Sequence, residues 1–164
     1  MRSFTDTTGR QWAIDLNIGA IKRVKSLVGV DLLEIQDGQL LVDLANDPMK
    51  MADILYAVVY PQATAKDVSD EAFGSALGGD AMRLGIDAFV EELIDFFQKL
   101  RPAVGQVLNK LWSKLETYNQ RAQQEAVRRV EDPRIDQAIE KAMSEVLTKA
   151  DEQLNALLGA SSTP

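Results

Sequence analysis

Polar and apolar residues alternate at the start of the chain, which predicts a β-hairpin. The alternation covers residues 3–6 and 11–16, on either side of the turn sequence Thr7-Thr8-Gly9-Arg10. Successive strand residues point to opposite faces, so this alternation places the apolar residues on one face of the hairpin. Gly9 supplies the positive φ that a tight turn needs. The predicted buried face consists of Phe4, Trp12, Ile14 and Leu16.

A capped helix is predicted directly after the hairpin. Asn17 is a favourable N-cap for a helix over residues 18–27, and Gly29 can end it in the left-handed conformation. A two-stranded hairpin is only marginally stable alone, so we expect it to pack on this helix. The apolar positions of the helix are Ile21, Val24, Leu27 and Val28, with Lys22, Arg23 and Lys25 on its outer face.

Residues 30–61 contain one ambiguous segment and one clear helix start. Apolar segments at 30–35 and 40–44 flank Asp37-Gly38, which predicts either a second short hairpin or a loop followed by a helix. We favour the helix, over Leu40–Ala45. Asp47-Pro48 starts the next helix, since aspartate caps well and proline suits the first helical position. Pro61 is expected to close it.

The rest of the chain predicts helices only. Ser69 opens a short helix carrying Phe73, and a strongly amphipathic helix covers residues 80–100. From Pro102 apolar residues keep heptad spacing for nearly three heptads, and Asp132-Pro133 begins a last helix with apolar residues three and four apart. These two long helices are predicted to form either an antiparallel hairpin or a kinked rod that oligomerises.

The predicted fold is therefore mainly α (α+β), with a short N-terminal β-hairpin packed on a helical domain and two long C-terminal helices. The predicted division is residues 1–100 for the hairpin and helical domain, 101–158 for the long helices and 159–164 for a flexible tail.

Composition argues against catalysis. The 164 residues include no histidine and no cysteine, so the commonest general base, the commonest metal ligand and a thiol nucleophile are missing. The glycines at 74, 78 and 79 are not followed by the lysine of a phosphate loop. Glu91 and Asp95 share a helix face, which we interpret as a solvated surface. We expect a non-enzymatic protein that needs no cofactor.

The net charge of −7 is concentrated in the middle of the chain, where residues 31–95 carry fourteen acidic and three basic groups. Such a surface repels phosphate backbones, so we expect no nucleic-acid partner. It is a solubilising surface or an acidic face for a basic or aggregation-prone partner. No apolar run approaches the ~20 residues of a membrane span, and the first residues lack the apolar core of a signal peptide. We expect a cytoplasmic protein with no membrane contact.

Two places are predicted to contact another chain. The apolar stripe of the 80–100 helix is wider than one buried side needs, so part of it is a candidate docking surface. Aromatic residues near the heptad seam are further candidates, because such residues often dominate interfaces. The predicted partner-binding residues are Phe89, Leu93, Phe96, Phe97, Trp112 and Tyr118.

The N-terminal pattern also resembles a known group of proteins. It reads Phe4-Thr-Asp-x-x-Gly-Arg-x-Trp-x-Ile-x-Leu-Asn, then Ile-Lys-Arg-Val and Gly29-Val-Asp-Leu-Leu. With Asp47-Pro48 and the segments 55–60, 68–73 and 91–97, it is similar to tail assembly chaperones and other tail-morphogenesis proteins of long-tailed bacteriophages and prophages. The resemblance covers about the first hundred residues and rests on pattern and order.

The resemblance implies a non-catalytic protein of the host cytoplasm that binds the long, hydrophobic tape-measure protein. It would keep that protein soluble and help tail-tube protein gather around it, with homo-oligomerisation as a further possibility. One alternative is a virion component, such as a neck, connector or tail-completion protein, that oligomerises through its C-terminal helices. Another is a small inhibitor that mimics DNA with its acidic middle.

Overall fold

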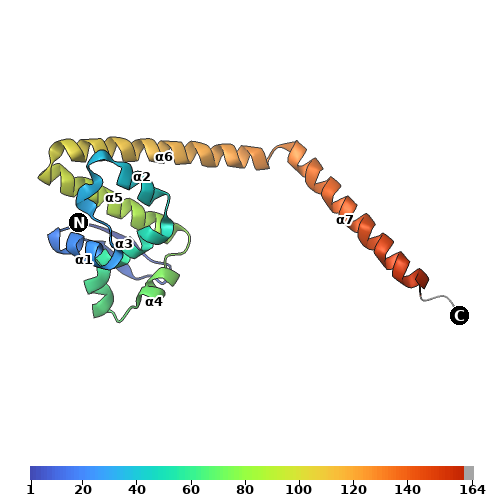
Figure 1. The fold of residues 1–164 in the computed structure, drawn as a ribbon, viewed down its shortest axis with the longest axis horizontal. Helices are drawn as coiled ribbons and strands as arrows, with labels where there is room; N and C mark the ends of the chain where they lie inside the picture. Colours follow the sequence, from blue (N-terminus) through green and yellow to red (C-terminus); the bar gives the residue numbers. More distant parts are fainter. Residues whose placement is uncertain (161–164) are drawn as a thin grey trace. The chain divides into compact units, whose positions relative to one another are not determined.

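The computed structural model describes residues 1–160, apart from the side chains of residues 36, 37, 159 and 160. Helices make up 78% of the structure and one two-stranded hairpin stands at its N-terminus, which confirms the predicted mainly-α (α+β) class. The chain divides into a compact unit of residues 1–115 and a second unit from residue 116 onward. Figure 1 shows the hairpin and α1 to α5 gathered within the first unit.

The hairpin forms as predicted. β1 (Arg2–Thr5) pairs antiparallel with β2 (Gln11–Ile14), and Phe4 lies opposite Trp12. Gly9 takes a φ of 84° in the turn. The four residues predicted for the inner face are all buried: Phe4, Trp12, Ile14 and Leu16.

Side chains of α3 (Pro48–Ala65) and of Lys66, the residue that follows it, cover the outer edge of β2. The Ala13 amide donates to Gln62 Oε1 over 2.9 Å, and Gln62 Nε2 donates to the Ala13 carbonyl over 2.7 Å. Lys66 donates to the Gln11 carbonyl and places its ammonium 5.2 Å from the centre of the Trp12 ring. A strand edge carries unpaired backbone groups, so these contacts replace a third strand.

α1 (Ile18–Val28) has the predicted caps but a different inner face. Asn17 accepts a hydrogen bond from the Ala20 amide, and Gly29 ends the helix with a φ of 75°. Leu27, one of the predicted apolar positions, is 57% exposed and does not belong to the buried face. The buried residues are Ala20, Ile21 and Val24.

A 3-10 helix, η1 (Leu32–Asp37), stands where a second hairpin was the alternative. Asp31 caps it by accepting from the Leu33 amide, and Leu32 and Ile35 are buried three residues apart, which matches the 3-10 repeat. α2 (Gln39–Ala45) follows, which confirms the favoured helix.

α3 begins as predicted but does not end at Pro61. Asp47 accepts from the Lys50 amide at its start, and the helix then runs through Pro61 to Ala65. Proline has no N–H to donate to the carbonyl four residues earlier, so the Ala57 carbonyl has no donor within the helix. Arg23 from α1 donates to the carbonyls of Ala57 and Val58 over 2.9 and 3.2 Å. This contact explains why α3 continues beyond Pro61. It also corrects the prediction that Arg23 lies on the outer face of its helix.

α4 (Asp70–Ser75) and α5 (Asp80–Leu100) complete the core of the first unit. Phe73 on α4 is fully buried, with its ring edge-on to Phe4 and Trp12 at centroid distances of 6.5 and 5.2 Å. α5 passes close to both α3 and β1 at Gly85, where a Cβ would lie 3.0 Å from Leu55 and 3.4 Å from Phe4.

α6 (Pro102–Val130) belongs to both units, so the boundary does not lie at the predicted Arg101-Pro102. Gly105 approaches the backbone of Gln98, and Leu108 is fully buried. The first turns of α6 are therefore part of the core.

α7 (Pro133–Ala160) includes the first two residues of the predicted tail, and residues 161–164 lie outside the described part of the chain. Between residues 133 and 158 every side chain of α7 is exposed, so the described residues do not form a packed antiparallel hairpin.

Candidate docking surface

Three of the six predicted partner-binding residues belong to the core. Phe89, Leu93 and Phe97 are fully buried within α5, so their prediction as a docking surface is corrected. The apolar stripe of α5, whose width predicts a partner chain, is wide because α5 contacts β1, α3 and the start of α6 within the same unit.

The other three differ in exposure. Phe96 and Trp112 are half-buried and pack against the core, with the ring of Phe96 5.5 Å from that of Phe97. Tyr118 is 70% exposed and lies in the second unit. The six residues therefore do not form one surface, and Tyr118 alone among them is open to a partner.

The acidic cluster on α5 anchors the N-terminal strand. Arg2 on β1 donates to Glu91, Glu92 and Asp95 over 2.5, 3.2 and 2.7 Å. The α-amino group of Met1 also lies 3.2 Å from Glu92. Hydrogen bonds from Arg2 to Asp95 and Glu91 raise the pKa of the guanidinium further above its ordinary value, against the effect of burial. The interpretation of this cluster as a merely solvated face is therefore corrected.

Asp6 is a buried carboxylate with a structural task. One oxygen accepts from the Thr8 amide, the Thr8 hydroxyl and the Arg10 amide, and the other accepts from Trp12 Nε1 over 2.9 Å. Burial alone would raise the pKa of Asp6, but hydrogen bonds from Thr8, Trp12 and Arg10 hold it below the usual value. Because these donors already bind both carboxylate oxygens, Asp6 is suited to anchor the turn and not to act as a general base.

A run of exposed apolar residues lies along α7. Met143 and Val146 are 61% and 66% exposed, and Leu157 is 72% exposed. Together with other apolar residues of α7 they form one line along the helix, which we call the α7 stripe: Ile135, Ile139, Met143, Val146, Ala150, Leu154 and Leu157. The three-four spacing of the sequence predicts these apolar positions, but the six predicted partner-binding residues lie on α5 and α6 and none of them on α7.

A hollow of about 620 Å³ lies beside the N-terminal end of the α7 stripe. Apolar side chains and three charged residues line it: Ile135, Ala138, Ile139, Ala142, Arg129, Asp132 and Arg134. Asp132 accepts from the Arg134 guanidinium over 2.6 Å, and this bond lowers the pKa of Asp132. The pairing gives the hollow an apolar floor without an unpaired carboxylate, which suits an apolar side chain of another helix.

Among the residues that the structure describes, no three acidic residues are grouped so that they could hold a metal ion. Within residues 1–160, no helix combines the length and the apolar character that crossing a membrane requires.

Comparison with protein-family models, with curated proteins and with solved structures found no match for this chain. The resemblance to phage tail-morphogenesis proteins therefore stays a prediction.

Proposed function

We propose that this protein is a non-catalytic phage tail assembly chaperone that binds the tape-measure protein in the host cytoplasm and assists tail-tube assembly. The observation that carries the proposal is the α7 stripe. It is a long apolar surface with no cover, on a chain whose first unit is fully packed.

The stripe has the geometry of a helix-binding surface. Apolar residues three and four apart on a helix dock against a second amphipathic helix, with each anchor filling a gap between side chains of the partner. A tape-measure protein, as the resemblance describes it, is long, helical and hydrophobic. The α7 stripe is suited to pack against the apolar helix faces of such a protein and to cover them.

Co-expression with the tape-measure protein of the same phage tests this function. We compare Val146→Asp, in the stripe, with Ser144→Asp, on the opposite face of the same helix. Both substitutions add one negative charge to an exposed position, so they differ only in the face that they alter. The wild-type chain and Ser144→Asp should keep the tape-measure protein in the soluble fraction, and Val146→Asp should fail.

Two results would count against the proposal. If the wild-type chain leaves the tape-measure protein insoluble, the chaperone function is refuted. If Val146→Asp protects as well as Ser144→Asp, the client is bound elsewhere.

The second candidate is a virion component that oligomerises through its C-terminal helices. Exposed apolar residues continue into the end of α6 at Val127 and Val130, which favours burial between copies over a longer stretch. Mass spectrometry of purified mature particles separates the two functions. A stoichiometric amount of this chain in the particle supports the virion component, and its absence supports the chaperone.

A further inference from the structure

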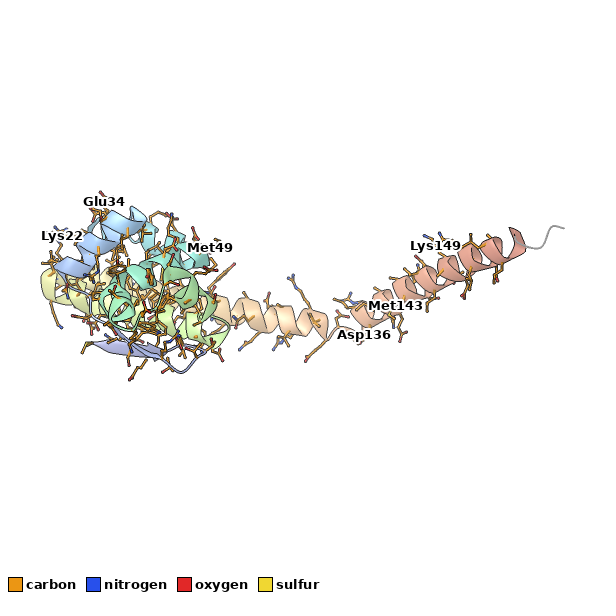
Figure 2. All side chains as sticks on the ribbon, turned by 90° about the horizontal axis from the view of Figure 1, so that it is seen from below. Lys22, Glu34, Met49, Asp136, Met143 and Lys149 are labelled. Atoms are coloured by element: carbon orange, nitrogen blue, oxygen red, sulfur yellow. The ribbon has the colours of Figure 1, made fainter. Side chains whose placement is uncertain are left out.

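One border of the α7 stripe, the row of helix positions that flanks it, is acidic. At about 100° per residue, Asp136, Glu140 and Asp151 project about 50°, 90° and 110° from the centre of the stripe, all to the same side. Side chains at such positions reach the flank of a helix that packs on the stripe. Figure 2 shows Asp136 and Lys149 on different sides of α7. A helix that covers the stripe therefore meets three carboxylates along one of its flanks.

The carboxylates of this acidic border have no cation of their own. All three side chains are exposed, and within residues 1–160 none of them forms an ion pair. The acidic cluster of α5, by contrast, binds Arg2. The acidic border of α7 is thus free to attract a positively charged partner.

An exposed leucine in the acidic border narrows the chemistry of that partner. Leu147 projects about 70° from the centre of the stripe, on the acidic side, and it is 63% exposed. Along the helix it lies between Glu140 and Asp151. Lysine and arginine lay an aliphatic stem on apolar surface while the charged head stays at a polar group. Either residue can cover Leu147 with its stem and pair its head with a carboxylate, whereas an apolar residue would leave the carboxylates unpaired.

The other border of the α7 stripe is small and has no net charge. Lys149 and Glu145 project about 90° and 130° from the centre of the stripe on this side, and their charges cancel. Three alanines accompany them: Ala138, Ala142 and Ala156. The first two also line the hollow beside the stripe. A partner flank on this side needs no charge and has room for bulky apolar residues.

A second copy of α7 does not complement the acidic border. In a parallel pair of identical helices each border faces the opposite border of the partner, and in an antiparallel pair like borders face each other. Parallel pairing therefore sets three carboxylates against a border without net charge. Antiparallel pairing sets carboxylates against carboxylates, which is repulsive. The charge pattern favours a different chain as the occupant of the stripe.

We propose that α7 binds a client helix whose apolar stripe is bordered on one side by lysine or arginine and on the other by uncharged residues. The basic border of the client packs along the acidic border of α7, and its uncharged border packs on the alanines. The inference rests on the proposed function, because the client is the chain that the α7 stripe covers, and it adds the chemistry by which α7 selects that chain.

Two labelled peptides as long as α7 are the probes. Each has an apolar stripe with the three-four spacing of α7 and glutamine along one border. The other border carries lysine in the basic peptide and glutamate in the acidic peptide. In fluorescence anisotropy at low salt, the full-length chain should bind the basic peptide at least about tenfold more tightly, because attractive pairs replace repulsive ones. At about 1 M salt, where the Debye length is roughly 3 Å, most of this preference should disappear.

Two double variants with the same change in net charge locate the preference. Glu140→Gln with Asp151→Asn removes two carboxylates from the acidic border and should reduce the preference to less than about threefold. The control is Gln137→Lys with Thr148→Lys, at exposed positions about 150° and 170° from the centre of the stripe. It should keep the wild-type preference, since its new charges lie on the far face of α7.

Three outcomes would overturn the inference: no binding of the basic peptide, equal affinity for both peptides, or a preference that Glu140→Gln with Asp151→Asn leaves unchanged. Co-expression separates such a failure from a failure of the proposed function. If the wild-type chain leaves the tape-measure protein insoluble, the chaperone function fails. If the wild-type chain and the double variant at Glu140 and Asp151 yield equal amounts of soluble tape-measure protein, the function stands and the basic border of the client is refuted.

Discussion

Replacing Asp6 with asparagine tests how the N-terminal hairpin is fixed. Asp6 is 4% exposed, and its two oxygens accept four hydrogen bonds from Thr8, Arg10 and Trp12. Asparagine has nearly the same volume but keeps only one of the two oxygens. Its amide nitrogen then faces Trp12 Nε1, so a donor meets a donor inside the core.

The expected loss follows from these contacts. A buried donor without an acceptor costs about 1–3 kcal/mol, and hydrogen bonds to a charged acceptor contribute about twice as much as neutral ones. The four bonds share one carboxylate, so their contributions do not simply add. We expect a decrease of about 3 kcal/mol in the free energy of unfolding, which corresponds to roughly 10 °C in Tm for a unit of this size.

The pH dependence supplies a second readout with a definite sign. Hydrogen bonding holds the pKa of Asp6 in the folded chain below its unfolded value of 3.8. The folded state therefore binds fewer protons than the unfolded state in this range. The stabilisation is complete above the unfolded pKa and disappears as the pH falls through the folded one. The gap between wild type and Asp6→Asn should narrow when the pH is lowered below about 4.

Urea unfolding at pH 7 and pH 3 measures both effects. Asp53→Asn is the control, because it makes the same chemical change at an exposed carboxylate of α3. It should unfold with the wild-type midpoint at pH 7. A loss below about 1 kcal/mol for Asp6→Asn at pH 7, or a gap that does not change with pH, would refute the reasoning.

Two further pairs of substitutions test the contacts that close the first unit. Gly105→Ala should destabilise it by about 2 kcal/mol in urea unfolding, because the new Cβ would lie 2.6 Å from the backbone nitrogen of Gln98. Gly74→Ala, which meets nothing within 4 Å, should instead stabilise it by about 0.5–1 kcal/mol, and equal effects would contradict the packing argument. Arg23→Met should cost about 1–2 kcal/mol, because it leaves the part-buried Ala57 carbonyl without a donor. In a Pro61→Ala background, where the helix supplies an N–H again, that cost should fall by at least half; an unchanged cost would mean that Arg23 acts elsewhere.

Local chemistry made much of the first unit predictable from the sequence. The hairpin, the Asn17 cap and the Asp47-Pro48 start depend on residues within a few positions of each other. Long-range contacts account for the errors. Pro61 fails to end α3 because the guanidinium of Arg23 from α1 donates to the freed Ala57 carbonyl, and no local pattern contains that information.

The same distinction explains the misplaced docking surface. Periodicity gives the width of an apolar stripe but not the number of neighbours that cover it. α5 has a wide stripe with neighbours in its own unit, so Phe89 is buried, whereas α7 has a stripe of ordinary width with none. Candidate surfaces on long helices thus depend on which helices remain uncovered, and this is known only once the fold is known.

The two units consequently owe their order to different sources. The first unit buries its own apolar residues, and substitutions such as Asp6→Asn act on its free energy of unfolding. α7 buries almost nothing within its own chain, and isolated helices gain little stability in water because most helical stability comes from packing. We therefore expect α7 to gain further stability when a partner, as proposed above, covers the stripe. Because Val146 is 66% exposed and lies outside the first unit, we expect its substitution to change association and to leave the free energy of unfolding of the first unit unchanged.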